Sequence, residues 1–187
     1  MERAVYDKNI LKDFTIRFCR IIEKHTDYII VSGFVAIASG RVRGTEDIDM
    51  FIKKLPKNKF IEFHNDLINN YFVCMQSDEP EEIYDSYLNE NLSVRYTLND
   101  MPLPEMEIKF PADDLDLYQF DIKTKLPQTG LDLWFSSINM NIAFKEEYLK
   151  SQKDIEDALH LRKFYAEMID EKEIIKIKKM IREYKLK

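Results

Sequence analysis

The sequence has few cysteines and no long apolar run, and each absence narrows the class of protein. Only Cys19 and Cys74 occur among 187 residues, and they lack the paired spacing of a zinc site. We therefore predict two reduced core residues, because free cysteine is among the most buried residue types. The chain contains no stretch of about 18 apolar residues, which argues against a membrane span.

A secretory leader and an excess of basic charge are also missing. No charged segment is followed by an apolar stretch and a small-residue cleavage site, so we expect a cytoplasmic protein. The net charge of -6 and the isoelectric point near 5.2 exclude a surface that coats nucleic acid as a whole. Any contact with RNA should be local.

No internal repeat, low-complexity tract or clear linker interrupts the chain. A chain of this length buries roughly 70% of the surface that its unfolded form exposes. We expect one compact domain over residues 1–187, with a core over about 1–140 and helices over about 141–187 packed on it.

Hydrophobic periodicity predicts an α+β fold, a mixed sheet flanked by helices with a C-terminal helical extension. Helices are expected over residues 8–25, 34–40, 56–70 and 145–164 and after Asp170, with a solvated helical turn within 78–85. Strands are expected over residues 28–32, 48–52, 71–75, 91–98 and 105–110, and at 131–136 after a surface segment.

The segment over residues 28–52 is the most informative part of the chain. An apolar strand ends at Ser32 and Gly33, a short helix follows, and a second strand begins with Asp47 and Asp49. Because strand side chains alternate between faces, the two carboxylates point the same way. Hard divalent cations such as Mg²⁺ or Mn²⁺ prefer oxygen ligands of this kind, so we predict a cation site.

The turn and the loop of this segment also suit a phosphate. Glycine allows positive φ and a close approach to the backbone at Gly33, and the next helix points free N–H groups at the same place. Arg41 and Arg43 can bind triphosphate oxygens with two hydrogen bonds each. The alternative is that Gly33 only makes a tight turn and that the arginines are solvated loop charges.

Two separated motifs carry a resemblance to a known family. Gly33, followed after fourteen residues by the Asp-Ile-Asp of 47–49, resembles the signature of the DNA polymerase beta type nucleotidyltransferase superfamily. Residues 40–49 are similar to small prokaryotic members, including toxins of toxin–antitoxin and abortive-infection systems. Lys145 and residues 151–158 resemble the lysine and the Lys-Asp-x-x-Asp motif of those relatives' C-terminal helices.

The superfamily has a third carboxylate on a neighbouring strand. Within residues 104–110, alternation places Glu105, Glu107 and Lys109 on one face. Glu107 is the preferred third ligand or base because it lies mid-strand between apolar neighbours, and Glu105 is the second choice. The acids of residues 113–121 also stay open. The alternative is an exposed face whose alternating charges satisfy one another.

The resemblance implies metal-dependent transfer of a nucleoside monophosphate from a nucleoside triphosphate to RNA, a protein hydroxyl or a small molecule. It implies that Asp47, Asp49 and Glu107 hold Mg²⁺ or Mn²⁺ and act in catalysis. The nucleotide-binding residues that it implies are Ser32, Gly33, Arg43, Thr45, Lys109, Lys145 and Asp154. The alternative is a catalytically inactive nucleotide-binding or protein-interaction module of the same fold.

Some features have a simpler structural interpretation. Phe34 replaces the second glycine or serine of the family's turn, a departure at the phosphate site. Lys153 and Asp157 have the i, i+4 spacing of a helix ion pair, worth about 0.3–0.5 kcal/mol. The histidines share no spacing, and we predict packing or surface roles for His25, His64 and His160.

Overall fold

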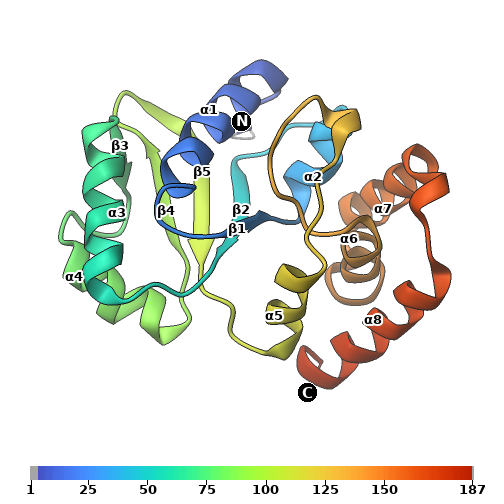
Figure 1. The fold of residues 1–187 in the computed structure, drawn as a ribbon. Coiled ribbons are helices and arrows are strands. Elements are labelled where there is room, and N and C mark those ends of the chain that lie inside the picture. Colours follow the sequence, from blue (N-terminus) through green and yellow to red (C-terminus); the bar gives the residue numbers. More distant parts are fainter. Residues whose placement is uncertain (1–3, 187) are drawn as a thin grey trace. The chain divides into compact units, whose positions relative to one another are not determined.

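The structure is a computed structural model that describes residues 4–186, and these residues divide into two compact units (Figure 1). Unit 1 comprises residues 4–28 and 43–111, and unit 2 comprises residues 29–42 and 112–186. Within residues 4–186, no helix is both long enough and apolar enough to cross a bilayer.

The helices and strands follow the predicted order closely in unit 1. The strands are β1 (Tyr28–Ile30), β2 (Asp47–Ile52), β3 (Phe72–Cys74), β4 (Val94–Leu98) and β5 (Met101–Lys109). The helices are α1 (Lys8–Ile22), α2 (Gly33–Ala38), α3 (Lys57–Asn69), α4 (Pro80–Glu82), α5 (Asp114–Asp121), α6 (Ile138–Phe144), α7 (Gln152–Phe164) and α8 (Glu171–Tyr184).

The strands form a five-stranded mixed sheet in the order β1-β2-β5-β4-β3. β2 and β5 are parallel, while β4 is antiparallel to both β5 and β3. The register aligns Asp49 with Glu107 on β5 and Glu107 with Arg95 on β4, so these three residues form one row across the sheet. The predicted α+β class, a mixed sheet flanked by helices, is confirmed.

One face of the sheet in unit 1 is covered by α1 and α3 (Figure 1). Phe18 of α1 lies 6.1 Å from Phe63 of α3 and 5.3 Å from Phe72 of β3, measured between ring centroids. Its ring also lies 6.0 Å from that of Tyr96 on β4. Because side chains alternate along a strand, this apolar packing leaves the row of Asp49 and Glu107 on the opposite face.

Both cysteines are free and buried, as predicted, Cys19 in α1 and Cys74 in β3. Residues 78–85 contain α4 and the start of a π-helical turn, Ile83–Tyr87, so the predicted helical turn is present.

Two predictions for unit 2 were wrong. Residues 131–136 form no regular strand: Phe135 makes isolated bridges to Ile30 and Thr124 instead. The segment after residue 111 contains α5, whose first turn is capped by the carboxylate of Asp113 accepting from the backbone N–H of Asp116. This acidic cap explains a helix that apolar spacing did not reveal.

We predict that His64 makes the stability of the protein pH-dependent. Its imidazole is buried, with Nδ1 2.9 Å from the Tyr96 hydroxyl, and burial lowers the pKa of His64 below the ordinary 6.5. A depressed pKa in the folded state means that the unfolded chain takes up the proton first. Stability is therefore full above pH 6.5 and falls as the pH drops below that value.

Thermal melts at pH 7.5 and 5.5 check this prediction. The melting temperature of wild type should fall more between the two pH values than that of His64→Gln, which keeps hydrogen-bonding groups but does not titrate. Equal falls in both proteins would contradict it.

Candidate metal centre

Three carboxylates of unit 1 meet on the uncovered face of the sheet. Oxygen atoms of Asp47, Asp49 and Glu107 all lie within 4.8 Å of one another. The parallel pairing of β2 with β5 produces this cluster, because Asp49 is the register partner of Glu107 and Asp47 lies two residues before Asp49 on the same face. We call these three residues the acidic triad.

The donor set of the acidic triad fits a divalent cation. Carboxylate oxygens are hard ligands of the kind that Mg²⁺ and Mn²⁺ take, and like charges this close repel one another without a counter-charge. The hydroxyl of Thr45 donates to the backbone carbonyl of Asp47 at 3.1 Å and lies 3.4 Å from its carboxylate oxygen Oδ1. Thr45 therefore helps to orient the first ligand.

The structure distinguishes the candidates for the third carboxylate. Glu107 belongs to the acidic triad, whereas Glu105 pairs in register with Asp47 and its carboxylate lies 3.5 Å from Arg95 Nε. Of the later acids, Asp113 and Asp116 belong to unit 2 and form ion pairs with Lys185. The geometry therefore favours Glu107.

Arg95 of β4 binds the acidic triad directly. Its Nε donates to Glu107 Oε2 at 2.8 Å, and Nη2 lies 2.8 Å from the same oxygen. The hydrogen bond with Glu107, and the charges of Glu107, Glu105 and Asp47, raise the pKa of the Arg95 guanidinium. The sequence analysis did not identify Arg95; the signal is its alternation with apolar Val94 and Tyr96 in a strand next to the acidic one.

Two other predicted residues of unit 1 have defined contacts. The ammonium of Lys109 lies 4.6 Å from the centre of the Phe51 ring, in a cation–π contact. Arg43 donates from Nη1 to the carbonyl of Gly44 at 3.0 Å. Their assignment to nucleotide binding stays a prediction.

The predicted phosphate turn lies in unit 2. Ser32 has φ 62°, in the left-handed region that non-glycine residues seldom adopt, and Gly33 begins α2. The positive φ expected of the turn is therefore at Ser32. Such strain often marks a functional position.

Lys145, in the π-helical turn after α6, is buried in an ion-pair network of unit 2. Its Nζ donates to Asp157 Oδ2 at 3.0 Å and to Asp154 Oδ1 at 3.3 Å. Arg41 Nε donates to the other oxygen of Asp157 at 2.8 Å. Ser151 caps α7 and hydrogen-bonds the Asp154 carboxylate. The lysine and the aspartates of the C-terminal motif thus meet, and they bind one another.

This network corrects the predicted faces of α7. Leu159 and Phe164, expected in the core, are 52% and 45% exposed, whereas Asp154 and Asp157 are buried. Asp157 pairs with Lys145 and Arg41 in this network, and Lys153 is exposed. A pair of carboxylates holding a buried lysine replaces the apolar face.

The histidines have packing roles, as predicted. His25 Nε2 lies 2.9 Å from a carboxylate oxygen of Asp66, and His160 Nε2 lies 2.9 Å from the carbonyl oxygen of Ser39.

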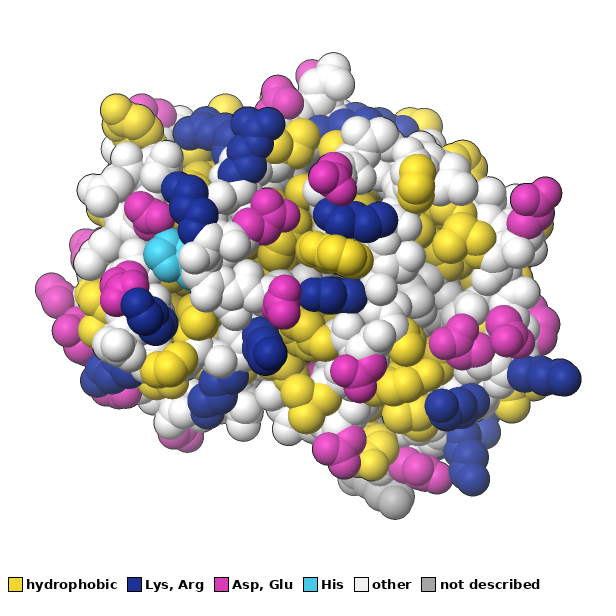
Figure 2. All heavy atoms as spheres, viewed as in Figure 1, with side chains coloured by type: hydrophobic (Ala, Val, Ile, Leu, Met, Phe, Trp, Pro, Cys, Tyr) yellow, Lys and Arg dark blue, Asp and Glu magenta, His cyan; other side chains and the backbone are white. Residues whose placement is uncertain are grey.

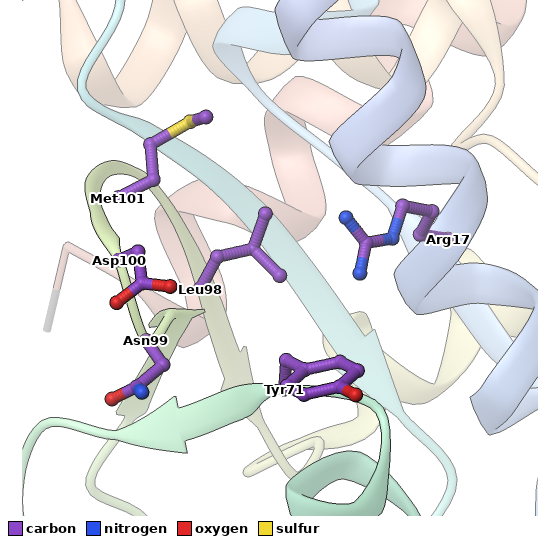
Figure 3. A pocket seen from close by; sticks show the side chains of 6 residues that line it. All are labelled: Arg17, Tyr71, Leu98, Asn99, Asp100 and Met101. Atoms are coloured by element: carbon purple, nitrogen blue, oxygen red, sulfur yellow. The ribbon is translucent and has the colours of Figure 1, made fainter.

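An open hollow lies elsewhere in unit 1, where Arg17 of α1 points toward Leu98 and Tyr71 (Figure 3). Its lining residues are Arg17, Tyr71, Leu98, Asn99, Asp100 and Met101. One carboxylate beside one guanidinium is no donor set for a cation, so the triad is the better site. Acidic and basic side chains are interspersed over the face shown in Figure 2, which fits the expectation of no extended basic surface.

The fold is similar to solved nucleotidyltransferase structures. The antibiotic-resistance factor ANT(2'')-Ia is 12% identical, with a TM-score of 0.58 over 95% of this chain and 94% of that one. An antigenic nucleotidyltransferase-like protein from Paracoccidioides brasiliensis is 14% identical, with a TM-score of 0.55 over 98% and 91%. No protein-family model and no curated protein matches the sequence. The chain therefore has the nucleotidyltransferase fold.

We predict that Lys145→Met destabilises the protein by about 3–5 kcal/mol, because it leaves the carboxylates of Asp154 and Asp157 buried without their cation. Urea unfolding measures the change in the free energy of unfolding. The exposed Lys153→Met on the same motif is the matched control and should stay within about 0.5 kcal/mol of wild type. Equal effects of the two substitutions would refute the structural role of Lys145.

Proposed function

We propose that the chain is a metal-dependent nucleotidyltransferase that moves a nucleoside monophosphate from a nucleoside triphosphate to an acceptor hydroxyl. The observation that carries the proposal is the acidic triad, Asp47, Asp49 and Glu107, on a sheet with the nucleotidyltransferase fold. The neighbours' names imply nucleotide substrates, and the hard-oxygen donor set supports Mg²⁺ or Mn²⁺.

The triad residues have distinct roles in this proposal. Asp47 and Asp49, adjacent on one face of β2, hold the cation, and the Thr45 hydroxyl fixes the first of them. Glu107 completes the ligand set from β5 and accepts the proton of the attacking hydroxyl. A bound divalent cation offsets the charge of the triphosphate and of the leaving pyrophosphate. The cation–π contact of Lys109 holds a positive charge on the same strand two residues beyond Glu107.

The acceptor is RNA, a protein or a small molecule, and a labelling experiment decides among them. Purified protein is incubated with α-labelled nucleoside triphosphates, Mg²⁺, and separate RNA, protein and small-molecule fractions of a cell extract. Label should appear in one fraction. Asp47→Asn and Asp49→Asn should each lower the rate by more than about 100-fold, because loss of an outer-shell partner alone costs about 10–100-fold.

The exposed Asp100→Asn in the β4–β5 turn is the matched control and should keep the wild-type rate. No transfer by wild type together with no nucleotide binding would leave an inactive module of the same fold. Transfer at equal rates by wild type and Asp47→Asn would remove the triad as the site.

The resemblance to toxin-type members adds a toxin role to the proposal. Induced expression of the wild-type chain should stop growth of a bacterial host, whereas Asp49→Asn expressed to the same level should not, because its loss of a metal ligand removes transfer. Growth curves and blots for protein level measure this. Normal growth with wild type, or equal arrest with both proteins, would count against the toxin role.

A further inference from the structure

Arg95 occupies the carboxylate that the proposed cation needs. It stands directly opposite Glu107 in the register of β4 with β5, and Glu107 stands opposite Asp49 in the register of β5 with β2. Two nitrogens of the guanidinium lie 2.8 Å from Glu107 Oε2, and its Nε lies 3.5 Å from Glu105 Oε2. One arginine thus binds two acids of the strand that supplies the third ligand.

The guanidinium is able to leave. The Arg95 side chain is 44% exposed, whereas those of Glu107 and Glu105 are 20% and 11% exposed. Arginine is always charged, so it cannot neutralise itself when a second cation arrives beside it. Two cations at one carboxylate repel each other, and the long exposed side chain is the one that moves.

We propose that Arg95 is a displaceable counter-ion of the acidic triad. It offsets the crowding of Asp47, Asp49 and Glu107 in the metal-free protein, and a divalent cation must displace it from Glu107 to gain its third ligand. Arg95 thereby raises the metal concentration at which the site fills. This inference rests on the proposed function only in requiring that the triad binds a divalent cation.

A purely structural ion pair is the competing account. Opposite charges across two strands stabilise a sheet modestly, and such a pair stays in place when metal binds. The two accounts differ in what the loss of Arg95 does to metal affinity, and in whether metal frees the guanidinium.

Titration with Mn²⁺, with the free ion followed by electron paramagnetic resonance, tests the inference on the full chain without nucleotide. Arg95→Gln should bind Mn²⁺ about tenfold more tightly than wild type, because a competing cation is removed from a ligand. Lys109→Gln is the matched control: it removes one positive charge from β5 two residues beyond Glu107 and should change the affinity less than threefold. Asp49→Asn should abolish the site.

The outcomes separate the two proposals. If wild type binds Mn²⁺ through the triad and Arg95→Gln binds no more tightly than Lys109→Gln, the counter-ion role fails and the metal site stands. If neither wild type nor Arg95→Gln shows Mn²⁺ binding that Asp49→Asn removes, the metal site fails, and the counter-ion role fails with it.

A second measurement needs no substitution at Arg95. Phenylglyoxal modifies free guanidinium groups, and mass spectrometry gives the rate at each arginine of the wild-type chain. Saturating Mn²⁺ should raise the rate at Arg95 several-fold while leaving the rate at Arg17 unchanged, since Arg17 lies over the Phe72 ring away from the triad. An unchanged rate at Arg95 would show that the ion pair persists and would overturn the inference.

Discussion

The repulsion among three carboxylates is the constraint on which the candidate centre depends. Asp47, Asp49 and Glu107 have oxygens within 4.8 Å of one another, and a sheet tolerates such crowding only with a counter-charge nearby. The structure supplies part of that charge through Arg95. The aromatic packing of α1 and α3 on the opposite face holds the strands in the register that creates the crowding. The fold thus holds acids together that would separate in a flexible chain.

Unit 2 solves the reverse problem, a buried cation. Lys145 is 1% exposed and Asp157 is fully buried, so each needs the other, and Arg41 satisfies the second oxygen of Asp157. This network joins the segment after α2 to α7 and the turn after α6 within one unit. The motif that resembles the family's C-terminal signature therefore has a direct structural reason for its residue types. Removal of one partner from such a network costs more than the network itself contributes to stability.

Alternation along strands made much of the candidate site predictable. The spacing of Asp47 and Asp49, and of Glu105 and Glu107, fixes which side chains share a face, and the structure has both pairs in strands. The choice between the two glutamates needed the register of β2 with β5, which one sequence does not contain. Arg95 was missed for the same reason, since its partner is set by strand pairing. The exposed Leu159 and the buried Asp157 of α7 were mispredicted because an ion pair outweighed the apolar pattern. Phe135 bridges two segments without forming a strand, which apolar content alone cannot distinguish.

The central claim is that the acidic triad is a divalent cation site. Anomalous scattering from crystals of the wild-type protein grown with Mn²⁺ tests it most directly, because it locates the ion without relying on activity. The account predicts a peak bonded to oxygens of Asp47, Asp49 and Glu107, at about 2.0–2.3 Å. Mn²⁺ bound only elsewhere, with the three carboxylates still free of metal at saturating concentration, would contradict it.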